Sequence, residues 1–427
     1  MNVTQAALAL HTLRHRTRVP EPVWRELQFR KLSRLLRHAY SNVPYYHNLF
    51  DAAGVTPDDV RTLEDVRHIP VTHPETYRSL PPQQRLAAGT VPDRLIARRT
   101  SGSTGIPLFI YFTPRELAWH ALLTLRAELE VGLRFTDHLT MIDPPGFEHQ
   151  PRWFEKFGIL RKSFVNAFDD VATQLGQLRR LRSDGVVSWA SHLRLLAQAA
   201  HALGMDDLRF RWAFAHSGPV FDEARELIAK TFGAEVFSRY DTWETFVIGW
   251  ECERRDGWHI DCDHVLLECL TDNRPTGGPG DVVVTNLDLY ATPIIRYALD
   301  DVASLDAEPC QCGRTFPRIR TIHGRLSDIL RLPGGRCLDF MVLQAIFRHM
   351  EAVVRYRVVQ ESLRDFRLEI VSAPGFSMSS IEPVVARFHE CCGSDLSLRL
   401  VMRDHIEQAS PQKWRYLVSE IPSEKPS

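Results

Sequence analysis

Apolar residues recur at helical spacing in some segments of the chain and at strand spacing in others, and the two patterns alternate. Residues 22–53 carry apolar positions at helical spacing, which predicts a helix that ends at Asn42-Val43-Pro44-Tyr45-Tyr46. A second amphipathic helix is predicted over 113–131, because Thr113 followed by Pro114 is typical of a helix start. Strands are then expected at 138–142, 186–189, 211–215 and 235–237, with helices at 191–203 and 222–232. This succession predicts an α/β body with a largely parallel sheet.

After Trp258 the pattern changes to short strands separated by glycine and proline turns. Strands at 265–268 and 281–285 predict a second sheet or a small barrel. From residue 325 onward we expect a compact α+β unit of roughly 100 residues, with helices at 339–349 and 381–391 and strands at 353–359, 365–371 and 397–401. The predicted fold is therefore α/β, with a large N-terminal domain (1–324) that contains mixed sheets and a small α+β C-terminal domain (325–427).

Composition and charge narrow the classes of partner. The chain has 427 residues, 44% of them hydrophobic, and a formal net charge of -1, so no general attraction to nucleic acid or anionic lipid is expected. No apolar run approaches a membrane span, and no cleavage site follows the first apolar stretch. We therefore expect a cytoplasmic protein that acts on small molecules, whose eight cysteines are thiols or metal ligands. A homodimer is compatible with the sequence, which does not determine the oligomeric state.

A loop rich in hydroxyl groups and glycine lies between two strand-like segments, at residues 100–108. Small side chains let backbone N–H groups approach phosphate oxygens, and the hydroxyls add further donors, so the loop is a candidate polyphosphate clamp. It is not a Walker A loop, because no lysine follows its second glycine. An ordinary surface turn is the alternative. The residues that would form the clamp are Thr100, Ser101, Gly102, Ser103, Thr104 and Gly105.

Several further segments follow this loop in a fixed order: 239–244, 293–301, 324–328 and 410–419. In that order, and with the segment 38–50 ahead of them, they resemble the adenylate-forming acyl ligase superfamily, specifically its phenylacetate-CoA ligase and CapK-like branch. The resemblance covers about residues 30 to 420. Taken singly, most of these residues are equally compatible with solvated carboxylates or core aromatics, so the order of the motifs carries the interpretation.

The resemblance implies a role for each nucleotide-binding position. The hydroxyl-rich loop would hold the β and γ phosphates of ATP, and Tyr240 would lie beside the adenine. Asp301 would accept hydrogen bonds from the ribose hydroxyls, and Arg325 would contact the nucleotide at the domain junction. These residues would together form the cofactor-binding site for ATP.

The resemblance also implies the two catalytic residues. Glu244 would help to hold Mg²⁺, which favours carboxylate and phosphate oxygens. Lys413 would stabilise the charge that develops when the substrate carboxylate attacks the α-phosphate. The small domain would then rotate about the junction at 325–328, withdraw Lys413 and admit the acceptor.

Two positions depart from the pattern of the branch. Asp241 and Asp300 stand where the branch usually has glycine, and each puts an acid where no side chain is expected. An altered nucleotide geometry or a weaker activity is the expectation for these positions. At the junction, Ser327 replaces the usual aspartate or lysine, and Asp328 follows it.

Four residues form a second constellation, which would suit tetrahedral Zn²⁺: Cys252, His259, Cys310 and Cys312. Similar placements of cysteine and histidine occur in the resembled branch. The alternative is that these cysteines are buried or incidental thiols, and Cys262 and Cys269 lie near enough in sequence to substitute.

The expected function is ATP-dependent activation of a carboxylic acid as its acyl-adenylate, followed by transfer to coenzyme A. The resemblance implies an aryl or arylalkyl acid, with Phe147, Phe214 and His216 as candidate pocket residues. The expected cofactors are ATP, Mg²⁺ and coenzyme A, with Zn²⁺ in a structural site. Two alternatives stay open: direct transfer of the acyl group to an amine or hydroxyl, and a noncatalytic nucleotide-binding homologue.

Overall fold

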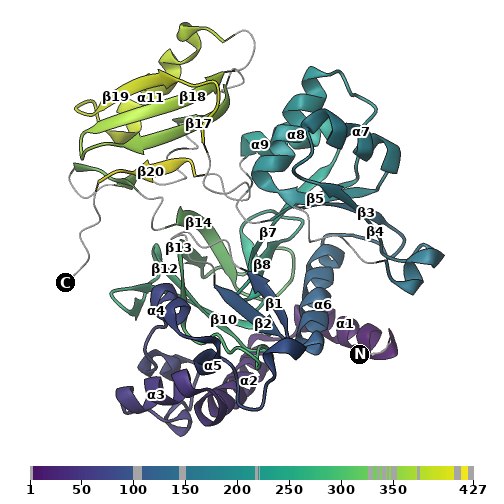
Figure 1. The fold of residues 1–427 in the computed structure, drawn as a ribbon, viewed down its shortest axis with the longest axis vertical. Coiled ribbons are helices and arrows are strands. Elements are labelled where there is room, and N and C mark those ends of the chain that lie inside the picture. Colours follow the sequence, from purple (N-terminus) through teal and green to yellow (C-terminus); the bar gives the residue numbers. More distant parts are fainter. Residues whose placement is uncertain are drawn as a thin grey trace. The chain divides into compact units, whose positions relative to one another are not determined.

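The computed structural model describes most of the chain, in two compact units. The large unit is formed by residues 1–220, 224–299 and 303–321, and the small unit mainly by 322–427. Figure 1 shows the elements of both units. The residues outside the description are 1–2, 100–107, 144–150, 217–219, 221, 326–329, 334–336, 339–342, 344–345, 348–352, 373–375, 408–414 and 422–427.

One twelve-stranded sheet forms the centre of the large unit, and one half of it is parallel. In that half β4, β3, β5, β6 and β7 lie side by side in this order, and all neighbours run parallel. Their bounds are β3 (His138–Asp143), β4 (Arg161–Asn166), β5 (Gly185–Trp189), β6 (Trp212–His216) and β7 (Glu235–Thr242). The strands predicted at 138–142, 186–189, 211–215 and 235–237 are confirmed. Their apolar runs suit strands of a parallel sheet, which are buried on both faces.

The other half of the sheet continues from β7, which pairs antiparallel with β8 (Phe246–Glu251). The strands that follow are β9 (Trp258–Ile260), β10 (Val265–Thr271), β11 (Arg274–Pro275), β12 (Gly280–Asn286), β13 (Tyr297–Asp306) and β14 (Arg318–Arg325). They add to the same sheet in the order β8-β9-β14-β13-β12-β10-β11. The prediction of a separate second sheet or barrel is therefore wrong, since the β7–β8 pairing joins both halves.

Helices flank this sheet. The predicted helix 113–131 is α6 (Pro114–Glu130), and its capping residue Thr113 accepts a hydrogen bond from the backbone N–H of Glu116 over 3.2 Å. α7 (Val171–Leu181) and α8 (Ala190–Ala202) pack on the parallel strands (Figure 1). The remaining long helices of the unit are α1 (Val3–Arg16), α2 (Glu21–Asn42), α3 (Pro44–Ala53) and α9 (Asp222–Phe232), with α4 (Pro74–Ser79) and α5 (Pro82–Arg85) as short ones.

Apolar side chains of α1 and α6 cover one face of the parallel strands. Leu122 and Leu123 of α6 pack with Val187, Phe214 and Phe237, which all point to this face. A separate cluster is centred on α2 and α3 and includes Tyr46 and Phe50. The first cluster packs against β5, β6 and β7, and the carboxyl ends of β6 and β7 lie at the candidate site.

The small unit has its own core and sheet. Its four-stranded sheet has the order β19-β18-β17-β20, in which β17 and β18 are antiparallel and both outer strands are parallel to their neighbours. The elements are β15 (Leu330–Arg331), β16 (Cys337–Leu338), β17 (Val353–Gln360), β18 (Asp365–Ser372), α11 (Glu382–Cys392), β19 (Ser397–Met402) and β20 (Leu417–Ser419). The predicted strands and the helix at 381–391 are confirmed, whereas the predicted helix 339–349 lies almost wholly outside the described residues.

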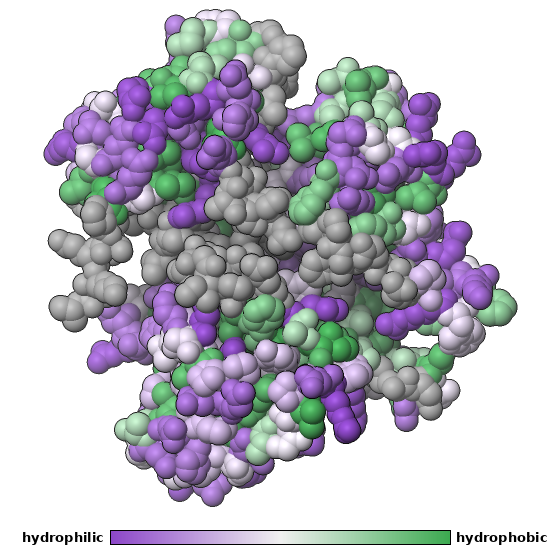
Figure 2. All heavy atoms as spheres, viewed as in Figure 1, coloured by the Kyte–Doolittle hydropathy of each residue, from purple (hydrophilic) through white to green (hydrophobic). Residues whose placement is uncertain are grey.

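On the face shown in Figure 2, hydrophilic and hydrophobic residues are interspersed over the described surface. Within the described residues, no helix combines the length and the apolar character needed to cross a membrane.

Candidate functional site

The turn that carries Glu244 joins β7 to β8. Thr242 pairs with Phe246 across the hairpin, so Trp243, Glu244 and Thr245 form the connection. The hydroxyl of Thr242 accepts a hydrogen bond from the backbone N–H of Thr245 over 3.2 Å, which closes the turn. The structure therefore places Glu244 at the tip of a short, hydrogen-bonded turn.

Phe246 ends this turn in a strained conformation. Its φ of 58° lies in the left-handed region, where a bulky residue costs on the order of 1–3 kcal/mol. The ring of Phe246 stacks on His120, with centroids 4.1 Å apart and planes 10° apart, and meets Phe112 edge to face at 5.2 Å. Packing thus holds the backbone two residues beyond Glu244 in a shape that it would not adopt alone.

Tyr240 lies two residues before the end of β7, where the pairing with β8 changes register between Tyr240 and Asp241. It is buried, with 7% of its surface exposed. The carboxyl ends of parallel strands are the usual place for ligands in open α/β sheets. His216 ends the neighbouring strand β6, so the structure brings the candidate adenine residue and one candidate pocket residue to the same edge of the sheet.

Two titratable groups at this edge have strongly shifted pKa values. Burial lowers the pKa of His216 to about 4, and burial raises the pKa of Asp143, at the end of β3, to about 7, with a further increase from Asp241. Arg239 opposes the increase at Asp143. A neutral histidine and an acid that titrates near pH 7 are therefore placed at the ends of two parallel strands.

The structure shows how the chain accommodates the two acids that replace glycine. The carboxylate of Asp241 lies 2.8 Å from the guanidinium of Arg239, which also lies 3.5 Å from the carboxylate of Glu128. Asp300 keeps a left-handed backbone, with φ of 59°. Aspartate tolerates this region better than most residues, so the chain keeps at this position the backbone shape that glycine favours.

The other predicted nucleotide-binding residues are placed only in part. Asp301 is a half-buried residue of β13, and Arg325 is the last residue of β14, with its side chain outside the described residues. Lys413 and the loop from Thr100 to Gly105 also lie outside the described residues. The loop connects two antiparallel strands, β1 (Ile96–Arg99) and β2 (Phe109–Phe112).

The candidate pocket residues have different surroundings. Phe214 is buried in the core of the large unit, where its ring lies 6.3 Å from that of Trp212 and 6.1 Å from that of Phe237. His216 lies nearer the strand end, with its ring 6.2 Å from that of Trp189. Phe147 lies outside the described residues.

The four predicted zinc ligands converge, although 60 positions of sequence separate the first from the last. Their ligand atoms all lie within 4.8 Å of one another. The sulfur atoms of Cys252 and Cys310 are 3.8 Å apart, and that of Cys312 lies 3.2 Å from Nε2 of His259. Two sulfurs bound to one tetrahedral zinc ion at about 2.3 Å would lie roughly 3.8 Å apart, so the set fits this metal.

Neighbouring groups orient His259 and Cys312. Nδ1 of His259 donates to the carbonyl of Phe316 over 3.0 Å, which leaves Nε2 facing the sulfur of Cys312. Hydrogen bonds from Cys252, then from His259 and the backbone of Arg314, lower the pKa of Cys312, and the thiolate is the form that binds metal. Strand pairing between β9 and β14 sets Arg318 opposite His259 and so brings the two halves of the set together.

Sequence reasoning missed two residues beneath the Glu244 turn. Asn286 donates from Nδ2 to the carbonyl of Glu244 over 3.2 Å, and Nε2 of His264 lies 2.8 Å from the carbonyl of Thr245. Asn286 ends a buried strand and His264 precedes another, so their positions alone do not distinguish them from ordinary core residues.

The chain is similar over most of its length to proteins named phenylacetate-coenzyme A ligase. It is 28% identical to the protein of Thermus thermophilus over 384 residues, which is 84% of each chain. It is 29% identical to that of Escherichia coli over 344 residues, which is 76% of each chain. No protein-family model matches the chain.

Solved structures of CoA ligases share the fold. A 2-hydroxyisobutyryl-CoA ligase in complex with its acyl-adenylate has a TM-score of 0.81 at 19% identity, over 95% of this chain and 91% of that one. The O-succinylbenzoate coenzyme A synthetase of Bacillus subtilis, in complex with ATP and a magnesium ion, has a TM-score of 0.54 at 14% identity, over 75% and 68%. The resemblance inferred from the motifs and the predicted fold class are therefore confirmed.

Proposed function

We propose that the chain is an ATP-dependent, AMP-forming ligase that activates an aromatic carboxylic acid and transfers the acyl group to coenzyme A. The observation that carries the proposal is the similarity to phenylacetate-coenzyme A ligases over 84% of both chains. The fold of solved ligases that bind acyl-adenylates supports it, as does a related structure that holds ATP and magnesium.

In the first half-reaction the acid attacks the α-phosphate of ATP. The Thr100 to Gly105 loop would hold the departing pyrophosphate, and Glu244 at the tip of its turn would bind Mg²⁺. Lys413 would stabilise the developing charge, because preorganised cations lower the energy of such transition states. Tyr240 and Asp301 would hold the adenine and the ribose, with Arg325 at the domain junction.

In the second half-reaction the small domain (325–427) would move relative to the large domain (1–324) and admit the acceptor. Coenzyme A is the proposed acceptor because both the sequence relatives and the structural neighbours are named for it. The pocket for the acid would lie at the carboxyl ends of the parallel strands, with His216 as a lining residue and Phe214 and Phe147 as further candidates. Absence of nucleic-acid and membrane partners, a homodimer and a cytoplasmic location stay predictions.

We further propose that Cys252, His259, Cys310 and Cys312 bind a structural Zn²⁺ ion. The support is the convergence of all four ligand atoms within 4.8 Å and the sulfur separation of 3.8 Å. With four protein ligands the ion would have a closed coordination sphere, which is typical of structural rather than catalytic zinc.

A panel of aromatic acids, tested for acid-dependent pyrophosphate release with and without coenzyme A, is the direct test. The proposal expects release with at least one acid and a thioester in the presence of coenzyme A, identified by mass spectrometry. Rapid formation of an amide or ester without any thioester would instead support direct transfer to an amine or hydroxyl. Binding of ATP without release for any acid would support the noncatalytic alternative.

A further inference from the structure

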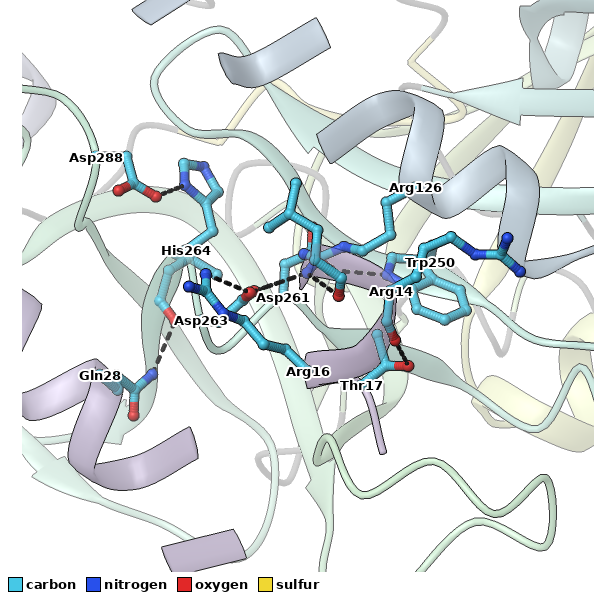
Figure 3. A network of polar contacts seen from close by, with 12 residues as sticks. Arg14, Arg16, Thr17, Gln28, Arg126, Trp250, Asp261, Asp263, His264 and Asp288 are labelled. Carbon is cyan, nitrogen blue, oxygen red and sulfur yellow. Dashed lines mark hydrogen bonds and ion pairs between the residues drawn. The ribbon is translucent and has the colours of Figure 1, made fainter. Parts of the chain in front are cut away.

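A network of half-buried and buried polar side chains lies beneath the turn that carries Glu244, and its centre is Asp288. The two carboxylate oxygens of Asp288 accept hydrogen bonds from Nζ of Lys31 over 2.7 and 2.8 Å. One of them also accepts from Nε1 of Trp119 over 3.0 Å. The same oxygen lies 2.9 Å from Nδ1 of His264 (Figure 3). Although burial raises the pKa of Asp288, Lys31 and His264 bring it below its usual value, so this carboxylate is ionised.

The side chain of His264 lies between Asp288 and the turn. Its side chain is fully buried, and its two ring nitrogens face the carboxylate of Asp288 and the carbonyl of Thr245, at 2.9 and 2.8 Å. The ring of His264 thus lies within hydrogen-bond distance of both acceptors and connects Asp288 to the backbone of the turn.

Asn286 holds the neighbouring carbonyl of the same turn. It is fully buried, donates from Nδ2 to the carbonyl of Glu244 over 3.2 Å, and accepts from the backbone N–H of Asp288 over 3.1 Å. Two consecutive carbonyls, those of Glu244 and Thr245, are thus bonded to two side chains that both bond to Asp288.

These hydrogen bonds hold the backbone of the turn next to a strained residue. The strained backbone of Phe246, with φ of 58°, directly follows Thr245. Without side chains that hold the preceding carbonyls, relaxation of this residue would rotate the peptide groups on either side of it. The carboxylate of Glu244 would then lose its fixed direction, because its backbone would no longer be held.

We propose that Asn286 and His264 are positioning residues that fix the backbone of the Glu244 turn and thereby direct the Glu244 carboxylate toward Mg²⁺ in the MgATP complex. The inference rests on the proposed function, in which Glu244 binds that ion. Neither residue touches substrate; both act through Glu244. Partners that orient a metal ligand typically change metal affinity or activity by about 10- to 100-fold when they are lost.

The same buried region offers a matched control. Gln28 of α2 is also a buried amide that donates to a backbone carbonyl, that of Val265, over 3.0 Å (Figure 3). Val265 follows His264 directly but lies outside the turn. Gln28→Glu and Asn286→Asp are therefore the same isosteric change, each of which sets a carboxylate against a carbonyl, and only the second faces Glu244.

The first measurement is the Mg²⁺ concentration that gives half-maximal pyrophosphate release. For Asn286→Asp and for His264→Leu we expect it to rise by about 10-fold or more, with the KM for the acid unchanged. His264→Gln, which keeps one donor for Thr245, should lie between His264→Leu and the wild type. In Gln28→Glu the Mg²⁺ requirement should stay at the wild-type value. An equal rise in Gln28→Glu would show a general loss of folding and overturn the proposal.

The second measurement does not need activity. Hydrogen–deuterium exchange of the amides at 242–246 should be faster by about 10-fold or more in Asn286→Asp and His264→Leu than in the wild type, and unchanged in Gln28→Glu. Unchanged exchange at these amides would overturn the proposal. If the wild type releases no pyrophosphate with any acid, the proposed function fails; the Mg²⁺ dependence of ATP binding by calorimetry then replaces the kinetic readout, and a shift confined to the two positions still supports the proposal.

Discussion

The guanidinium of Arg239 lies 2.8 Å from the carboxylate of Asp241 at the end of β7, and only 12% of the arginine side chain and 18% of the aspartate side chain are exposed. This pair explains how an acid is tolerated beside Tyr240, where the resembled branch usually has glycine. The negative charge that Asp241 adds to the site is compensated within the same strand.

Removal of the Asp241 carboxylate is therefore expected to destabilise the fold. In Asp241→Asn the buried Arg239 would lose its carboxylate partner at 2.8 Å and keep that of Glu128, at 3.5 Å, and the free energy of unfolding should fall by about 3 kcal/mol. Denaturant titration measures the loss. The matched control is Asp207→Asn, which breaks the exposed pair with Arg179 and should cost less than about 1 kcal/mol. Equal losses in the two variants would contradict a compensating role for Arg239.

Asp300 should tolerate glycine but not a β-branched residue, because its φ of 59° lies in the left-handed region. We expect Asp300→Gly to stay within about 1 kcal/mol of the wild type, and Asp300→Val to lose about 1–2 kcal/mol or more. The unfolding midpoint in urea gives both values. Arg320→Val, at an exposed position of β14 without positive φ, controls for the substitution itself. A valine as stable as glycine at position 300 would refute the backbone argument.

Zinc content tests the metal site. Protein purified without chelators should contain about one zinc ion per chain, and Cys312→Ser should lose most of it. Because a structural zinc ion contributes on the order of 10 kcal/mol to folding, both this variant and chelation should lower the thermal midpoint. Cys269→Ser, a buried thiol outside the set of four, serves as the control and should keep its zinc. Elemental analysis that finds no zinc after growth with added zinc would exclude the site.

The pH dependence of stability should report on Asp143. Its pKa of about 7 in the folded state lies above the usual value of 3.8, so between these limits the native state binds more protons than the unfolded state. The contribution of Asp143 to the free energy of unfolding therefore falls as the pH rises from about 4 to 7. His216, with its pKa lowered to about 4, acts in the opposite direction up to its usual value of 6.5. Asp143→Asn removes only the first contribution.

The comparison of wild type and Asp143→Asn isolates that contribution. The variant should gain stability relative to the wild type as the pH rises from about 4 to 7, measured by denaturant titration at each pH. Asp206→Asn, at an exposed position, should show a constant difference from the wild type. A constant difference for Asp143→Asn as well would mean that this carboxyl titrates normally in the folded protein.

Lys413→Ala should lower the rate of acid-dependent pyrophosphate release by about 100-fold or more, because a positioned cation would be lost from the transition state. Lys230→Ala, a lysine on the surface of α9, should retain the wild-type rate. Reaction of a supplied acyl-adenylate with coenzyme A should be largely preserved in Lys413→Ala, since the lysine would be withdrawn in that step. Unchanged pyrophosphate release would refute the role given to Lys413.

Local patterns predicted most elements of the fold. The capping pair at Thr113 and Pro114 fixed the start of α6, and the apolar run before Asp143 gave β3, because both depend on residues close in sequence. The joining of the two halves of the sheet was not predicted. It depends on the pairing of β7 with both β6 and β8, and strand pairing is not visible in periodicity.

The residues of the candidate site were likewise predicted only in part from the sequence. The order of the motifs gave Tyr240, Glu244 and Asp301, and the sequence also offered the four zinc ligands as a possibility. Whether those ligands meet was decided by the pairing of β9 with β14, which brings His259 to the loop that carries Cys310. Asn286 and His264 could not be found at all, since a buried polar residue shows its partner only after the chain has folded.

By itself, then, the sequence determined the alternation of elements, the order of the motifs and hence the relationship to acyl ligases. Each of these features depends only on residues that are close together in the sequence. Only the tertiary structure decided that Asp300 keeps a left-handed backbone, that Arg239 neutralises Asp241, and that Asn286 holds the turn of Glu244. The physical reason is that backbone conformation, burial and hydrogen bonding between distant segments depend on the register of strands that pair across the whole sheet.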